Sequence, residues 1–275
     1  MACFVRQSLD AARLITTDRS VHEQIMRDVL KWAAEMDLNT SPPVLAQRIH
    51  QRLREITGVK DPYRSAKDQT NLVALQLLPE LRKALERAKD PLAMAVRLAI
   101  AGNMIDMGVA SHITETQIRQ AVGQAMEMSL CGSQADFKNS VDRARDIVYL
   151  ADNAGEIVFD RLLIEQLGPA RITIVVRSAP ILNDATMVDA MTAGLHNLVT
   201  VMDNGSDAPG TILTDCSKGF IDRFNAADLI VSKGQGNYET LSEAPNNIYF
   251  LFKAKCHVIA ADVGQPVGTH MLMHR

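Results

Sequence analysis

The chain has 275 residues, of which 47% are hydrophobic and 22% charged, so it can bury the core of one large domain or of two modest ones. A net charge of -3 and an aromatic share of 4% disfavour nucleic-acid binding, because the chain has no excess of basic residues to neutralise phosphates and few aromatic residues to stack on bases. No run is apolar enough for a membrane span, and no signal peptide is recognisable. The four cysteines form no CxxC pair. Together these observations predict a cytoplasmic protein without a cysteine-bound zinc.

The first half of the chain is predicted to be helical. Residues 41–58 begin with a capping serine and two prolines, repeat leucine and isoleucine along one stripe, and end at a glycine. Residues 71–88 and 90–109 show the same helical spacing. No segment before residue 140 has the pattern of a strand, so the sequence predicts a helical domain over residues 1–140.

The second half changes to short β-branched segments, each bounded by glycine, proline, asparagine or aspartate, at residues 146–153, 171–177, 197–203, 228–234, 248–254 and 257–263. Helical patterns lie between several of them, which predicts an α/β domain over residues 141–275 with a mostly parallel sheet. The last two segments are too close in sequence for a helical crossover, so we expect a hairpin or an antiparallel edge there.

Polar residues follow four of the predicted strands, and Lys253 closes a fifth. In open α/β sheets, ligands bind outside the carboxyl ends of the strands, so these residues are candidates for a site. Asp152, Asn153 and Asp184 offer the carboxylate and amide oxygens that Mg²⁺ or Mn²⁺ prefers. The segment KGQGN at 233–237 suits a phosphate, because its glycines let backbone N–H groups approach an oxyanion. Metal and phosphate sites together predict phosphoryl chemistry.

Each polar group also has an ordinary structural explanation. Asp152-Asn153 and Asn183-Asp184 are natural helix caps, Asp203-Asn204-Gly205 is a turn signal, and KGQGN is compatible with a plain loop.

The helical half holds two further polar groups. Asn103 and Asp106 share one face of an otherwise apolar helix, where an acid and an amide are costly to bury unless they are bonded or functional. Asp61, Lys67 and Asn71 are interpreted as parts of a solvated loop.

The motifs DNAGE at 152–156, NDAT at 183–186, KGQGNYE at 233–239, GNMID at 102–106 and DPY at 61–63 resemble the DUF89 family of metal-dependent phosphatases, in its short archaeal and bacterial branch. They occur in the expected order over nearly the whole chain. The resemblance implies an N-terminal all-helical domain packed on a Rossmann-like three-layer α/β/α domain. It also implies an enzyme that hydrolyses a small phosphorylated metabolite with a divalent metal.

The same resemblance assigns roles to individual residues. It implies that Asp152, Asn153 and Asp184 hold the metal, and that Lys253 meets the substrate phosphate, with Lys255 as a rival. Asp152, Asp184 and Lys253 are therefore the expected catalytic residues. The expected substrate-binding residues are those that would line the crevice around them: Asn103, Asp106, Glu156, Lys233, Gly234, Gln235, Gly236 and Asn237.

The expected mechanism uses Mg²⁺, Mn²⁺, Co²⁺ or Ni²⁺ to polarise a phosphoryl group and orient a water, with Asp184 or Glu156 as a base. A covalent aspartyl-phosphate route is disfavoured, because Ala154 stands where such enzymes carry a second acid. Two alternatives remain open: an S-adenosylmethionine-dependent carboxyl methyltransferase, and a non-catalytic protein that binds a phosphometabolite. The substrate is left open among sugar phosphates, phosphopantetheine-like compounds and damaged nucleotide or cofactor phosphates. The oligomeric state is also left open.

Overall fold

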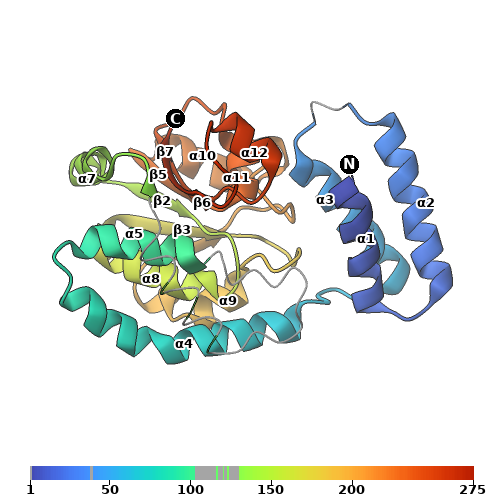
Figure 1. Ribbon diagram of the computed structural model, residues 1–275, viewed down its shortest axis with the longest axis horizontal. Coiled ribbons are helices and arrows are strands. Elements are labelled where there is room, and N and C mark those ends of the chain that lie inside the picture. Colours follow the sequence, from blue (N-terminus) through green and yellow to red (C-terminus); the bar gives the residue numbers. More distant parts are fainter. Residues whose placement is uncertain (1, 38–39, 103–115, 117–119, 121–122, 124–129) are drawn as a thin grey trace.

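The computed structural model describes residues 2–37, 40–102, 116, 120, 123 and 130–275. Its first three helices, α1 (Ala2–Ile15), α2 (Arg19–Glu35) and α3 (Pro42–Thr57), form a bundle at one end of the molecule (Figure 1). Their apolar stripes close a small core of Ala11, Ala12, Ile25, Val29, Leu45, Ile49 and Leu53. The predicted ends of α3 are confirmed, since Ser41 precedes it and Gly58 ends it in the left-handed conformation.

The described residues also form a seven-stranded sheet in the order β1-β7-β6-β5-β2-β3-β4. Its strands are β1 (Leu130–Cys131), β2 (Ile147–Leu150), β3 (Ile172–Val176), β4 (Thr200–Asp203), β5 (Leu229–Lys233), β6 (Ile248–Lys253) and β7 (His270–His274). Strands β2 to β6 pair in parallel, and β7 runs antiparallel to β6. The predicted mostly parallel sheet is therefore confirmed.

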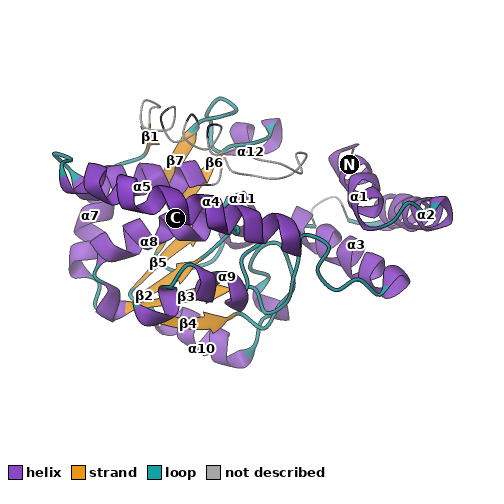
Figure 2. Cartoon of the chain, turned by 90° about the horizontal axis from the view of Figure 1, so that it is seen from below, coloured by secondary structure: helices purple, strands orange, loops and turns teal. Residues whose placement is uncertain are grey.

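Helices cover both faces of the sheet (Figure 2). Alternate residues of each strand point to opposite faces: Ile147 and Tyr149 join one buried cluster, whereas Val148 and Leu150 join another. The first cluster lies under α4 (Arg64–Glu86), α5 (Pro91–Gly102), α7 (Gln134–Arg143), α8 (Glu156–Leu167) and α9 (Met187–Thr192), and the second under α10 (Lys218–Ala226), α11 (Gln235–Leu241) and α12 (His257–Asp262). This is the three-layer α/β/α arrangement that the resemblance implied.

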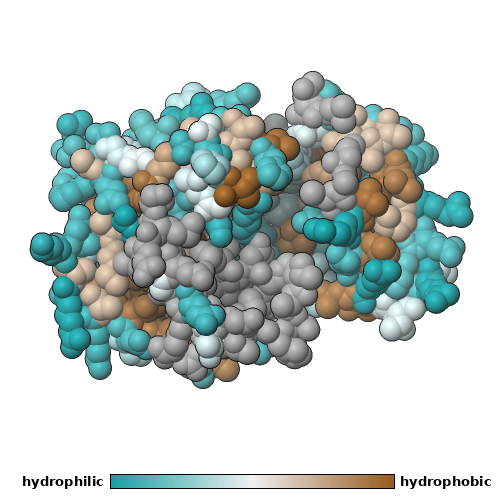
Figure 3. Space-filling model, viewed as in Figure 1, coloured by the Kyte–Doolittle hydropathy of each residue, from teal (hydrophilic) through white to brown (hydrophobic). Residues whose placement is uncertain are grey.

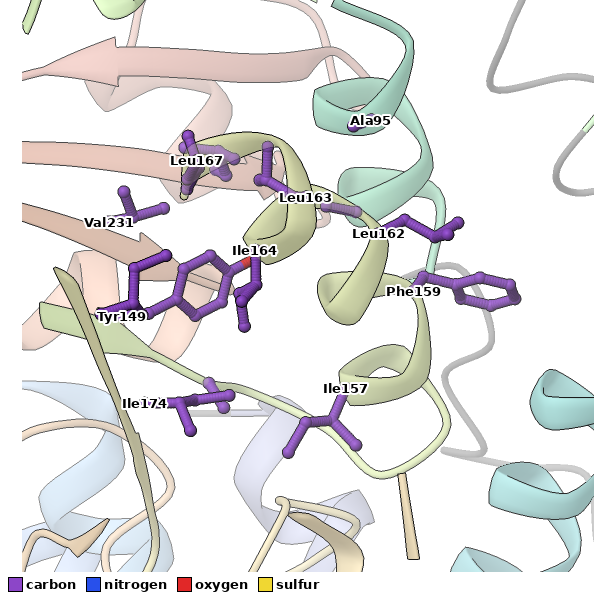
Figure 4. Close-up of a cluster of buried hydrophobic side chains, with 14 of the residues drawn as sticks. Ala95, Tyr149, Ile157, Phe159, Leu162, Leu163, Ile164, Leu167, Ile174 and Val231 are labelled. Carbon is purple, nitrogen blue, oxygen red and sulfur yellow. The ribbon is translucent and has the colours of Figure 1, made fainter. Parts of the chain in front are cut away.

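Helix α8 is the central helix of the first layer. Figure 4 shows Leu163 of α8 between Ala95 of α5 and the strand residues Tyr149 and Val231, and Ile157 of the same helix on the side of Ile174. Helices α4 and α5 thus contribute to the same buried core as the sheet. The buried core therefore extends across residue 140, where the sequence places a domain boundary.

The helical bundle contacts the α/β part through polar side chains of α3. Gln47 donates to Asp207 at 2.7 Å and to Asp215 at 2.8 Å, and Arg54 forms an ion pair with Asp207. Ser41 donates to the backbone oxygen of Glu239 at 3.1 Å. These hydrogen bonds and the ion pair join the bundle to the loops after β4 and to α11.

Two secondary-structure predictions are wrong. Residues 257–263 were expected to form a strand, but His257–Asp262 form the helix α12, since two alanines favour a helix and only Ile259 and Ala260 are buried. The antiparallel neighbour of β6 is instead β7, whose sequence HMLMH contains no β-branched residue and so gave no strand signal. The short strand β1 also precedes residue 140.

The surface in Figure 3 mixes hydrophilic and apolar residues. Leu14 and Leu30 are among the large apolar side chains that are exposed. In the part of the chain that the structure describes, we find no helix that is both long and apolar enough to cross a membrane.

Candidate active site

The carboxyl ends of β2 and β3 bring two of the predicted motifs into direct contact. Asn153 and Asp184 form an isolated antiparallel bridge. Ala185 donates its backbone N–H to the Asp152 carbonyl at 2.7 Å, and Ala154 donates to that of Asn183 at 2.8 Å. These backbone contacts place Asp152, Asn153 and Asp184 next to one another, and the three residues are only 9%, 7% and 3% exposed.

These side chains form a concentrated anionic group. The Asn153 Nδ2 donates to Asp152 Oδ2 at 2.7 Å and to Glu156 Oε2 at 2.9 Å. Burial, and then the charges of Glu156 and Asp184, raise the pKa of Asp152 well above its usual range, although Lys255 and Arg177 oppose the shift. A cation bound between these oxygens would remove the repulsion.

Lys233 has a different role from the one expected. Its ammonium is fully buried and donates to Glu156 Oε1 at 2.6 Å, to Asp160 Oδ1 at 2.6 Å and to the Ala99 carbonyl at 2.8 Å. Burial lowers its pKa, but Asp160 and Glu156 outweigh burial and raise it overall. An ammonium has three donors, and all three have acceptors here. We therefore correct the expectation that Lys233 binds phosphate: it pairs with two buried acids.

Asp160 belongs to the same network, and sequence reasoning missed it. Its Oδ1 also accepts from the Tyr149 hydroxyl at 2.8 Å. Burial raises the pKa of Asp160 to about 6, with Lys233 opposing and Glu156 adding to the shift. The signal was available, since Glu156 and Asp160 are four residues apart on one side of a helix and are separated only by the apolar residues Ile157, Val158 and Phe159.

Arg177 is a second buried cation that sequence reasoning missed. It directly follows β3. It donates through Nε to Asp184 Oδ2 at 2.8 Å and through a terminal nitrogen to Asn237 Oδ1 at 3.0 Å. Asn237 in turn donates to the Lys233 carbonyl at 2.7 Å. Asn237 therefore supports Arg177 and the end of β5, and these contacts differ from the substrate binding that was expected of it.

The glycines of KGQGN are explained by close packing. Gly234 has a φ of +82°, and a Cβ at this position would lie 2.0 Å from Asp152 Oδ2. A Cβ on Gly236 would lie 2.3 Å from the Pro209 carbonyl oxygen. Gln235 donates to Glu239 at 2.7 Å and accepts from the backbone N–H of Lys255 at 3.0 Å. The segment thus closes tightly over the Asp152 carboxylate, and phosphate binding by Gly234, Gln235 and Gly236 stays a prediction.

Replacing Gly234 with alanine should displace the Asp152 carboxylate, because the new methyl group overlaps it and the positive φ is strained for alanine. We expect a loss of about 1–3 kcal/mol in unfolding free energy together with weaker metal binding. Thermal unfolding and Mn²⁺ titration would measure both. Gly219→Ala is the matched control, since nothing lies within 4 Å of its Cβ position and it lies in α10. A Gly234→Ala protein as stable as this control would contradict the packing argument.

The two C-terminal lysines differ in their relation to the site. The charge of Lys255 is one of the effects that lower the pKa of Asp152. Lys253 closes β6 opposite His270, and burial and Lys255 lower its pKa. The expectation that Lys253 meets the phosphate, with Lys255 as its rival, stays a prediction, and the effect of Lys255 on Asp152 favours Lys255.

Helix α4 also reaches the DNAGE loop, and the interpretation of Lys67 and Asn71 as solvated residues is wrong. Both are fully buried. Asn71 accepts from the backbone N–H of Gly155 at 2.6 Å and donates to Asp189 at 2.9 Å. The Lys67 ammonium lies 3.0 Å from Asp189, in an ion pair whose alignment does not meet hydrogen-bond geometry.

Arg64 donates to the same acid at 2.7 Å. Burial raises the pKa of Asp189, but Lys67 and Arg64 prevail and hold it at about 2. The Asp189 network thus ties α4 to α9 and to the loop that carries Asp152.

Two predicted residues, Asn103 and Asp106, lie outside the described residues. Within the described ranges, no group of three or more His, Cys, Asp or Glu side chains is placed to hold a metal ion. A metal site at the bridge would therefore consist of two carboxylates and one carboxamide, Asp152, Asp184 and Asn153.

Comparison with known proteins places these motifs in a family. Residues 1–271 match the model of the damage-control phosphatase ARMT1-like domain. The chain is 36% identical to a damage-control phosphatase of Archaeoglobus fulgidus, covering 97% of this chain and 94% of the relative. It is 32% identical to the damage-control phosphatase PH1575 of Pyrococcus horikoshii, covering 99% and 96%.

The solved structure of that Pyrococcus horikoshii DUF89 family protein superposes on this fold with a TM-score of 0.90 at 31% identity, covering 99% of this chain and 96% of that one. The fold, the order of the motifs and the matches over the whole length agree. The chain therefore belongs to the damage-control phosphatase ARMT1-like family, also called DUF89.

Proposed function

We propose that this protein is a metal-dependent phosphatase that hydrolyses a small phosphorylated metabolite at the carboxyl ends of β2 and β3. The observation that carries the proposal is the bridge between Asn153 and Asp184. Together with the neighbouring Asp152, it groups one carboxamide and two carboxylates. The family membership and the names of the relatives support the phosphatase activity.

The donor set fits a hard divalent cation. Carboxylate and amide oxygens suit Mg²⁺ or Mn²⁺, and a magnesium site uses one or two carboxylates completed by waters and substrate phosphate. The described site also carries excess negative charge, because the four buried acids Asp152, Glu156, Asp160 and Asp184 face the buried cations Lys233 and Arg177. The charge of Lys255 offsets part of this excess, and a bound divalent cation would offset more of it.

Asp152, Asn153 and Asp184 would hold the metal, which when bound polarises a phosphoryl group and offsets its charge. Arg177 fixes Asp184 from one side by its hydrogen bond to Oδ2. Lys255 would stabilise charge on the phosphoryl oxygens, which is a large part of what phosphoryl transfer requires of a protein. The base stays open between Asp184 and Glu156, since Glu156 accepts hydrogen bonds at both oxygens and Asp184 accepts one from Arg177.

The test is phosphate release by chelator-stripped protein against a panel of sugar phosphates, phosphopantetheine-like compounds and nucleotide or cofactor phosphates. Mg²⁺, Mn²⁺, Co²⁺ and Ni²⁺ are added back one at a time. We expect turnover that requires an added metal. Heat on titration with S-adenosylmethionine, without phosphate release, would favour the methyltransferase alternative. Stoichiometric retention of a phosphorylated compound without turnover would favour a binding protein.

Lys255→Met is expected to lower kcat by about 10²-fold, because one donor to the transition-state charge is lost. Its Mn²⁺ affinity should change little, since the lysine would meet the phosphate rather than the metal. Lys253→Met is the matched control, with the same substitution two residues away. A larger loss in Lys253→Met than in Lys255→Met would reverse the assignment of the two lysines.

A further inference from the structure

We infer that Glu156 is a positioning residue that fixes the carboxamide of Asn153 so that its carbonyl oxygen, Oδ1, is the end turned to the bound metal. The inference rests on the proposed function for the identity of the bound group. The hydrogen bonds that support it do not depend on that function.

The orientation of Asn153 follows from the chemistry of its neighbours. The two ends of a carboxamide have nearly the same shape, so its direction is decided by hydrogen bonding. One end lies 2.7 Å from Asp152 Oδ2 and 2.9 Å from Glu156 Oε2. An NH₂ group can donate to both oxygens at once, whereas a carbonyl oxygen there would be repelled by the Glu156 carboxylate, which pairs with Lys233. The Oδ1 atom must therefore occupy the opposite end.

Glu156 is itself held in place. It is fully buried at the start of α8, and its other oxygen, Oε1, accepts from Lys233 at 2.6 Å. Lys233 is fixed in turn by Asp160 at 2.6 Å and by the Ala99 carbonyl at 2.8 Å. Glu156 cannot rotate away from Asn153 without leaving a buried cation short of a partner, which is costly.

The direction of the carboxamide matters because a hard cation binds the oxygen of an amide and not its NH₂ group. With Asp152 alone, the NH₂ group of Asn153 would have one acceptor. Glu156 supplies a second acceptor and connects Asn153 to the Lys233 network. Hydrogen-bonded partners behind metal ligands are commonly worth about 10–100-fold in metal affinity. The geometry assigns that role to Glu156.

A double-mutant cycle tests the inference through Mn²⁺ affinity, measured by calorimetry on chelator-stripped protein. Glu156→Gln should weaken Mn²⁺ binding by about 10–100-fold, because glutamine can turn its own NH₂ group toward Asn153. Glu156→Asp, which keeps the charge but shortens the reach, should also weaken it. In an Asn153→Asp background, Glu156→Gln should change the affinity much less, because a carboxylate has oxygens at both ends.

Glu165→Gln is the matched control, since it removes one charge from the same helix at a carboxylate that pairs with Arg82 and Arg161. It should leave Mn²⁺ affinity unchanged. An unchanged affinity in Glu156→Gln would overturn the inference. An equal loss of Mn²⁺ affinity in the unmutated and the Asn153→Asp backgrounds would also overturn it, because Glu156 would then act as a metal ligand or through its charge alone.

A second readout needs no metal. The side-chain NH₂ resonances of Asn153, identified by their absence in Asn153→Asp, should exchange slowly with solvent and should exchange faster in Glu156→Gln but not in Glu165→Gln. Rapid exchange in the unmutated protein would overturn the inference. If the resonances behave as expected while the protein binds no Mn²⁺, the orienting role of Glu156 is supported and the metal-dependent function is the claim that fails.

Discussion

Replacing Asp152 with asparagine is expected to lower metal-dependent phosphate release by about 10³-fold, since a metal that has lost a carboxylate ligand no longer supplies several kcal/mol of charge stabilisation. The metal-free protein should keep its stability or gain some. The pKa of Asp152 is raised by burial and by Glu156 and Asp184, so the ionised carboxylate is disfavoured in the folded state and a neutral amide relieves repulsion. Activity and stability should therefore change in opposite directions.

Phosphate release at saturating Mn²⁺ and denaturant unfolding in chelator would measure the two effects. Asp203→Asn is the matched control, because Asp203 ends β4 at the same edge of the sheet but is exposed and accepts only a local hydrogen bond from Gly205 at 2.9 Å among its described contacts. A loss of both activity and stability in Asp152→Asn would indicate that the residue is a helix cap or turn residue, as the structural explanation of the sequence suggests.

Replacing Lys233 with methionine is expected to cost about 3–5 kcal/mol of unfolding free energy, because it leaves Glu156 and Asp160 buried without their cation. Equilibrium unfolding in urea would measure the loss. A second substitution, Asp160→Asn, should restore part of the stability, since it removes one of the two unpaired charges.

The control is Lys138→Met, which breaks an exposed ion pair with Asp142 on α7 and should change the unfolding free energy little. If Lys233→Met were as mild as this control while phosphate binding was lost, the lysine would be a substrate-binding residue after all. The original expectation from the sequence would then be correct.

The sheet was predictable because its central strands are buried on both faces and so form continuous apolar, β-branched segments. Residues 146–153 and 228–234 are the clearest cases, and both contain strands. Strand β7 could not be found in this way, because Met271, Leu272 and Met273 favour a helix as readily as a strand. Its pairing with β6 is decided by the fold around it.

The sequence predicts the parts of the site that depend on where the strands end. It does not predict the parts that depend on which way a side chain points. The rule that ligands bind beyond the carboxyl ends of parallel strands grouped Asp152, Asn153 and Asp184, which the structure brings into contact. The same rule cannot tell whether Lys233 points outward to a ligand or inward to acids on α8. That choice depends on Asp160, a partner 73 residues away in sequence.

The most direct test of the metal-dependent site is a diffraction experiment on crystals soaked in Mn²⁺, with data collected for anomalous scattering. We predict an anomalous peak bound by the carboxylates of Asp152 and Asp184 and by the carbonyl oxygen of Asn153, at about 2.0–2.2 Å, as hard six-coordinate ions require. A protein that releases phosphate only with Mn²⁺ but shows its anomalous peak away from these three residues would contradict the account.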